Sequence, residues 1–239
     1  MLVAVVFVGL TACDALPGKP RPEDRPVVPA KVTDFDTLYA GNCAGCHGAN
    51  GQLGAARPLN DPLYLVLVGP GVITPIIANG IPSTAQPAFA QRAGGMLTDE
   101  QVGILARGLA PRWGQPDRFR GVSLPPYSNA DAQQAGSGSG DPQRGAAAYG
   151  KYCAQCHGET GSGGPKAGSI VDPSYLALVS DQALRTAVIA GRNDLGMPDW
   201  RNYLPGQPMS PQEISDVVAW LSSRRVPFPG QPYANKGVK

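Results

Sequence analysis

The sequence contains one short motif twice, in which two cysteines separated by two residues are followed by a histidine. The motif occupies positions 43–47 (CAGCH) and 153–157 (CAQCH). The two copies contain four of the five cysteines and both histidines of the 239-residue chain. A fold for this chain must therefore present the same set of thiol and imidazole side chains twice, with almost no side chains of that chemistry left for another site.

The motifs belong to a longer internal repeat. Three segments recur in the same order and at a nearly constant offset: 39–51 with 149–161, 61–68 with 172–179, and 98–109 with 210–221. The same unit therefore occurs twice. The predicted organisation is a first domain at 33–110, a linker at 111–140, a second domain at 141–226 and a tail at 227–239. The linker ends in AGSGSG, a composition typical of flexible connections.

Each copy carries helix signals and no convincing strand. Asp-Pro pairs, which suit the cap and first residue of a helix, occur at 61–62, 141–142 and 172–173. Capping boxes begin at Thr98 and Ser210, and apolar residues follow each of them at helical spacing. The predicted fold class is all-α.

The chemistry of the motif follows from its spacing. A CxxC pair at the end of a helix places two thiols on one side of a turn, with the next imidazole beside them. Both thiols can form thioethers with haem vinyl groups while the histidine binds the iron, so the motif is typical of c-type haem attachment. A zinc site would need a fourth ligand that neither copy supplies, and a thioredoxin-like redox pair would need a βαβ context that is absent.

The sequence thus predicts two covalently bound haem c groups, one in each copy. Their iron ligands are predicted to be His47 and His157. The predicted thioether residues are Cys43, Cys46, Cys153 and Cys156.

The repeat resembles two copies of the class I cytochrome c domain. The resemblance implies a helical fold around each haem, with attachment of the haem on the outer face of the cytoplasmic membrane. In this family the second axial ligand is usually a methionine in a loop before the last helix. Met197 matches that pattern, because it precedes a proline and lies shortly before the Ser210 cap.

The first copy departs from the pattern, because Gln86 takes the place of Met197 at the same offset. Three alternatives remain for the sixth ligand of haem 1. Met96, just before the Thr98 cap, binds the iron; Gln86 binds weakly through its amide oxygen; or the position is open. The preference of iron for a soft thioether favours Met96, whereas the register of the repeat favours Gln86 or an open position.

The segment at 1–13 resembles a bacterial lipoprotein signal. Its apolar run at 2–10 falls short of the roughly 20 residues that span a bilayer. The sequence LTAC at 10–13 resembles a lipobox, which predicts lipidation of Cys13. No Lys or Arg precedes the apolar run, so the alternatives are a true start upstream of Met1 or an uncleaved partial anchor. A free buried thiol is the alternative for Cys13 itself. Five prolines at 14–32 predict an extended spacer that reaches up to ~55 Å.

The formal net charge is +2 with both signs mixed along the chain, which argues against a nucleic-acid partner. We expect a lipid-anchored di-haem electron carrier on the periplasmic or other extracytoplasmic face of a bacterial membrane. Its expected partners are a membrane complex of a respiratory or photosynthetic chain, or another redox protein. The alternative is a haem enzyme that acts on peroxide, nitric oxide or a sulfur compound at a weakly ligated haem 1, although no distal acid or base is evident.

Overall fold

The computed structural model describes residues 18, 20–21, 24–82, 84–227 and 229, and its contacts divide the chain into two units. The first unit ends at Val32 and contains the short 3-10 helix η3 (Pro29–Lys31), whose residues are all exposed. The second unit begins at Thr33 and contains both copies of the repeat. The predicted lipidation residue Cys13 lies outside the described residues.

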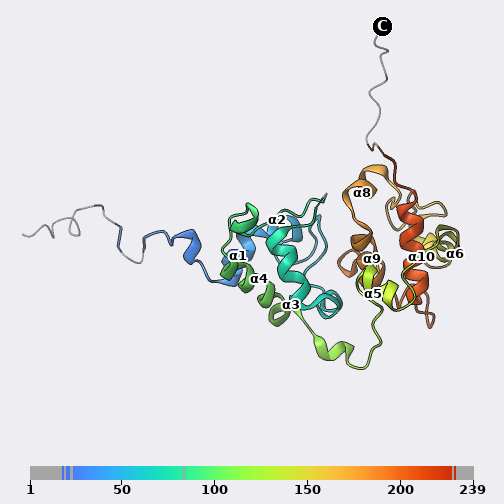
Figure 1. The fold of residues 1–239 in the computed structure, drawn as a ribbon, viewed down its shortest axis with the longest axis horizontal. Helices are drawn as coiled ribbons and strands as arrows, with labels where there is room; N and C mark the ends of the chain where they lie inside the picture. Colours follow the sequence, from blue (N-terminus) through green and yellow to red (C-terminus); the bar gives the residue numbers. More distant parts are fainter. Residues whose placement is uncertain (1–17, 19, 22–23, 83, 228, 230–239) are drawn as a thin grey trace, which may run out of the picture. The chain divides into compact units, whose positions relative to one another are not determined.

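Helices account for all the regular structure of the described residues, which confirms the all-α prediction (Figure 1). The first copy contains α1 (Phe35–Asn42), α2 (Ala44–His47), α3 (Pro62–Asn79), η4 (Gln91–Ala93) and α4 (Asp99–Trp113). The connecting segment contains η5 (Pro116–Phe119) and α5 (Asn129–Gln134). The second copy contains α6 (Pro142–Tyr152), α7 (Ala154–His157), α8 (Pro173–Leu178), α9 (Asp181–Ala190), η6 (Asn193–Leu195) and α10 (Pro211–Ser222).

The helix starts lie where the sequence predicts them. The Asp61 carboxylate accepts the backbone N–H groups of Leu63 and Tyr64 at 3.0 and 3.1 Å, so it caps α3. Thr98 and Ser210 each form the complete capping box. In both copies the first helix packs against the last, α1 on α4 and α6 on α10.

Helix α3 is longer than either of the helices that correspond to it in the second copy. It runs for 18 residues, with a kink at Gly69, where φ is 60° and ψ is 169°. The second copy divides the same stretch into α8 and α9. By length and composition α3 is the one described helix that could cross a membrane. The kink splits it into two segments far shorter than the roughly 20 residues that a span requires, and Leu65 and Val68 are buried in the protein.

The connecting segment is more ordered than its composition predicts. Helix α4 continues through Pro111 to Trp113, whose ring packs edge-on against Tyr39 at 5.1 Å between centroids. Farther on, the Pro126 carbonyl accepts two hydrogen bonds from Arg185 of α9, at 3.0 and 2.8 Å. Arg185 is fully buried. The segment before AGSGSG is therefore fixed to the second copy.

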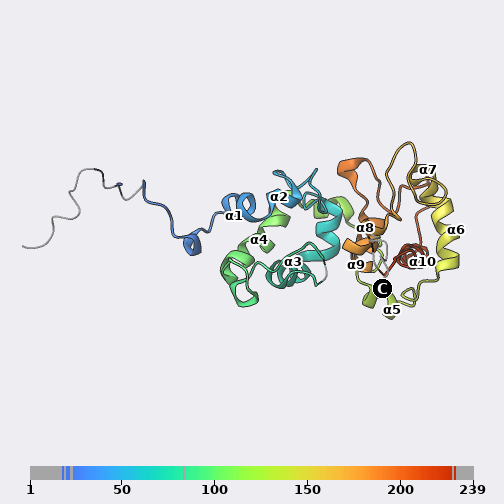
Figure 2. The same ribbon diagram turned by 90° about the horizontal axis from the view of Figure 1, so that it is seen from above.

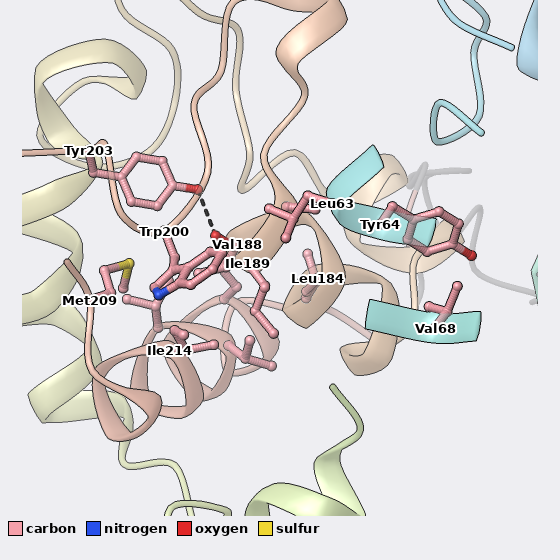
Figure 3. Close-up of a cluster of buried hydrophobic side chains, with 14 of the residues drawn as sticks. Leu63, Tyr64, Val68, Leu184, Val188, Ile189, Trp200, Tyr203, Met209 and Ile214 are labelled. Carbon is pink, nitrogen blue, oxygen red and sulfur yellow. Dashed lines mark hydrogen bonds between the residues drawn. The ribbon is translucent and has the colours of Figure 1, made fainter. Parts of the chain in front are cut away.

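The two copies share one apolar core. Leu63, Tyr64 and Val68 of α3 belong to the same buried cluster as apolar residues of α9 (Figure 3). The α9 residues of that cluster shown in the figure are Leu184, Val188 and Ile189. Helices α3 and α9 come into contact, and Figure 2 shows them as neighbours from a second direction. This contact brings the two CxxCH-bearing copies into one compact unit.

Candidate haem-attachment sites

Each CxxCH motif lies on a single helical turn that follows the first helix of its copy. The Cys43 N–H donates to the Tyr39 carbonyl at 2.8 Å, and the His47 N–H donates to the Cys43 carbonyl at 2.9 Å. The corresponding bonds at Cys153 and His157 are 2.8 and 3.1 Å long. Residues three and four apart on a helix lie on one face, so the two thiols and the imidazole of each motif project together.

A tyrosine and a glycine fix the turn after each histidine. The Tyr39 hydroxyl donates to the Gly48 carbonyl at 2.8 Å, and Tyr149 makes the same bond to Gly158. Gly48 has a φ of +83°, and a Cβ there would lie 1.9 Å from the Gln52 carbonyl oxygen. Only glycine fits this position, because both the backbone conformation and the close approach exclude a side chain.

The tautomer of each histidine is set by a backbone carbonyl. Nδ1 of His47 lies 2.6 Å from the Arg57 carbonyl oxygen, and Nδ1 of His157 lies 2.9 Å from that of Gly168. A ring nitrogen beside a carbonyl carries the proton, so the lone pair is left on Nε2, the atom available to iron. The sequence reasoning missed both carbonyls. The only signal was that they follow their histidines at almost the same sequence distance in the two copies.

The four motif cysteines are free, so their thiols are available for attachment. Burial raises the pKa of Cys43 to about 11 and that of Cys153 to about 12. In the described parts of the chain, no three Cys, His, Asp or Glu side chains converge as a metal site.

The structure places the candidate sixth ligands differently in the two copies. Met197 is partly buried against the core, in a loop before α10. Gln86 is partly exposed, and its Nε2 donates to the Pro87 carbonyl at 3.5 Å. Burial lowers the His47 pKa, and the hydrogen bond with the Arg57 carbonyl opposes that shift. Met96, the alternative sulfur ligand, has a side chain that is 79% exposed.

Polar contacts between the copies lie close to the first motif. Arg57 donates from Nη2 to the Gly191 carbonyl at 3.0 Å, and Arg192 donates from Nη2 to the Gly54 carbonyl at 3.3 Å. The Asp194 carboxylate accepts the backbone N–H of Leu53 at 3.0 Å. Arg192 and Asp194 are themselves paired at 2.9 Å.

A covalent haem fits these residues. Each copy presents two free thiols and an imidazole with a free Nε2 on one helical turn, and each imidazole is held by a carbonyl. The fold and the two sites define a di-haem c-type cytochrome of class I, which is an electron carrier. Cytochrome c domains of this kind are typically extracytoplasmic.

The chain belongs to the family described as cytochrome c oxidase, cbb3-type, subunit III. The match covers residues 30–107 and 140–221, which together make up more than half of the chain, with one match on each copy of the repeat. No curated protein gives a significant match.

Two solved structures show weaker similarity. The reducing HAO-like protein complex of Kuenenia stuttgartiensis aligns with 84% of this chain and 100% of its own at 18% identity, with a TM-score of 0.44. Dihydro-haem d1 dehydrogenase NirN in complex with DHE aligns with 41% of this chain at 27% identity and a TM-score of 0.29. The aligned part is 18% of the NirN chain. At these TM-scores neither structure adds to the assignment, which rests on the family match.

Proposed function

We propose that this chain is a membrane-tethered electron relay on the extracytoplasmic face, acting as a subunit or partner of a cbb3-type oxidase. The first haem is attached at Cys43 and Cys46 and the second at Cys153 and Cys156. Their iron ligands are His47 and His157, and Met197 completes the coordination of haem 2. Lipidation at Cys13 holds the chain at the membrane.

The observation that supports this role is the pair of equivalent sites inside one compact unit. When bound, each haem supplies a one-electron couple that needs no proton transfer. The protein's part is to hold the imidazoles rigidly through the Arg57 and Gly168 carbonyls, 2.6 and 2.9 Å away. The shared core and the hydrogen bonds of Arg57 and Arg192 across the copies keep the two sites together. A fixed arrangement of this kind suits the passage of an electron from one haem to the other.

The partner is inferred from the family, which is named for a subunit of a cbb3-type cytochrome c oxidase. The test is to mix the reduced, haem-loaded chain rapidly with membranes that contain such an oxidase, and to follow haem oxidation and oxygen uptake. We expect both haems to be oxidised with matching oxygen uptake. Oxidation no faster than in membranes lacking the oxidase would overturn the proposed partner.

The anchor is tested separately with a Cys13→Ser variant. The native chain should remain with membranes in high salt, where electrostatic attachment is screened, and the variant should be released. A Cys153→Ser variant is the matched control, because it also loses one thiol but keeps the lipobox. Equal retention of native and Cys13→Ser protein would rule out lipidation at this residue.

A further inference from the structure

The loop that carries Gln86 in the first copy contains the counterpart of a backbone hydrogen bond found in the loop that carries Met197 in the second. The Ile81 N–H donates to the Gln86 carbonyl at 3.0 Å, and the Arg192 N–H donates to the Met197 carbonyl at 2.9 Å. These two bonds are related by the repeat offset of 111. The backbone of Gln86 therefore corresponds to that of Met197 in its hydrogen bonding as well as in its sequence position.

A glycine fixes the position of each loop. A Cβ at Gly80 would lie 2.7 Å from the Gln86 carbonyl oxygen, and one at Gly191 would lie 2.5 Å from that of Met197. Both glycines have a positive φ, +68° and +71°. Both copies therefore need a glycine where this loop passes close to the end of the preceding helix, and the residue at the Gln86 and Met197 position differs between them.

The side chain of Gln86 is partly exposed, and its Nε2 donates to the Pro87 carbonyl at 3.5 Å. Nδ1 of His47 is bound to the Arg57 carbonyl at 2.6 Å, so Nε2 is the nitrogen left for iron. Gln86 is therefore assigned by its position in the loop, which is the position that Met197 has in the second copy.

No other side chain in the described part of the first copy offers a buried sulfur outside the motif. The chain has four methionines, at positions 1, 96, 197 and 209. Met96 is 79% exposed. The equivalent of the buried Met209 is Leu97, which is 5% exposed. Leu97 donates its N–H to the Phe89 carbonyl at 2.8 Å, as Met209 does to the Trp200 carbonyl at 2.9 Å.

We propose that Gln86 is the residue opposite His47 at haem 1, and that it leaves this iron able to bind a small neutral ligand of the carbon monoxide or nitric oxide class. An amide oxygen is a hard, weak ligand for ferrous iron, whereas a thioether is soft and is retained. Haem 1 then also has the lower potential, because methionine ligation raises it. This proposal rests on the proposed attachment of a haem at His47.

The test uses the full haem-loaded chain, reduced and titrated with carbon monoxide. We expect the native protein to bind carbon monoxide at half of its haems. Gln86→Met should abolish that binding and raise the potential of haem 1. Gln86→Ala adds no sulfur and should still bind carbon monoxide. This control shows that a loss of binding in Gln86→Met is not caused by damage to the loop.

Two further variants complete the design. Met197→Gln reproduces the first copy in the second and should double the carbon monoxide bound per chain. Met96→Leu should leave binding and the methionine–iron absorption unchanged. The proposal is overturned if the native chain binds no carbon monoxide, or if Met96→Leu creates a binding haem.

Haem content separates the possible failures. Two haems that resist acid-acetone extraction, together with no carbon monoxide binding, would reject the role of Gln86 and leave the electron relay standing. A chain that carries no covalent haem would reject both proposals.

Discussion

The two copies of the repeat agree on the side that attaches the haem and differ on the opposite side. In both, a tyrosine hydroxyl bonds to the glycine after the motif, and a carbonyl holds Nδ1 of the histidine. On the other side, Met197 and Gln86 occupy corresponding positions in loops that keep one backbone hydrogen bond and one positive-φ glycine in common. On the proposed assignment of the sites, attachment would depend on a backbone frame that both copies keep, and the chemistry of the iron would depend on the one side chain that differs.

The largest effect should come from removing a thioether residue in either copy. Cys43→Ala and Cys153→Ala should each weaken covalent attachment in their own domain only, because the two frames share no motif residue. The alkaline pyridine assay should return two covalent haems for the native chain and close to one for each variant. A loss of both haems in either variant would contradict the independence of the two attachment sites.

A smaller effect should follow from removing Arg185, which has no equivalent in the first copy. Its guanidinium is buried and bonds to the Pro126 carbonyl and, at 2.9 Å, to the Ser215 hydroxyl. Arg185→Ala leaves these groups unpaired and should lower the free energy of unfolding by about 3 kcal/mol. Urea unfolding, monitored by tryptophan fluorescence, measures the free energy of unfolding of the variant and of the native chain.

The matched control is Thr74→Ala, since Thr74 occupies the position of Arg185 at the offset of 111. Its hydroxyl bonds to the Pro70 carbonyl of its own helix, in an exposed position. The change in free energy should stay within about 0.5 kcal/mol. Equal effects of the two variants would contradict the distinction between the copies.

The smallest predicted effect is the contribution of Asp194 to the pH dependence of stability. Its hydrogen bond with Arg192 holds the pKa of Asp194 below the usual value of about 3.9. A carboxylate with a lower pKa in the folded state than in the unfolded state stabilises the folded protein at pH values above its unfolded-state pKa. This stabilisation is lost as the pH falls through the folded-state pKa. Asp194→Asn should therefore cost about 1 kcal/mol at neutral pH, and the difference from the native chain should shrink below about pH 4.

The control for this prediction is the exposed pair of Arg92 and Asp99, at 3.0 Å. Asp99 is 72% exposed, so Asp99→Asn should change stability by less than about 0.5 kcal/mol. Urea unfolding at a series of pH values compares both variants with the native chain. A difference for Asp194→Asn that does not change with pH would refute the acid dependence.

Short-range signals made much of this fold predictable. The caps at Asp61, Thr98 and Ser210 are local hydrogen-bonding patterns, and the structure confirms them. The helical class and the tandem cytochrome c domains also followed from the sequence, and the family match confirms them. These features need only residues within a few positions of one another.

The features that sequence reasoning missed depend on contacts between distant residues. The first domain was expected to end at residue 110, but α4 continues through Pro111 to Trp113, whose ring packs on Tyr39. The connecting segment looked flexible because its anchor, Arg185, lies far along the chain from Pro126. The carbonyls that hold the two histidines carry no side-chain identity, so no residue type could have marked them.

The contacts between the copies have a consequence for how such a chain recognises itself. Arg57 and Arg192 each donate across the boundary, and at the repeat offset their counterparts are Gly168 and Ile81. Two identical first copies would lack the second donor, and two identical second copies would lack the first. Each copy is thus complementary to the other copy rather than to a second copy of its own kind, which disfavours pairing of like copies between neighbouring molecules.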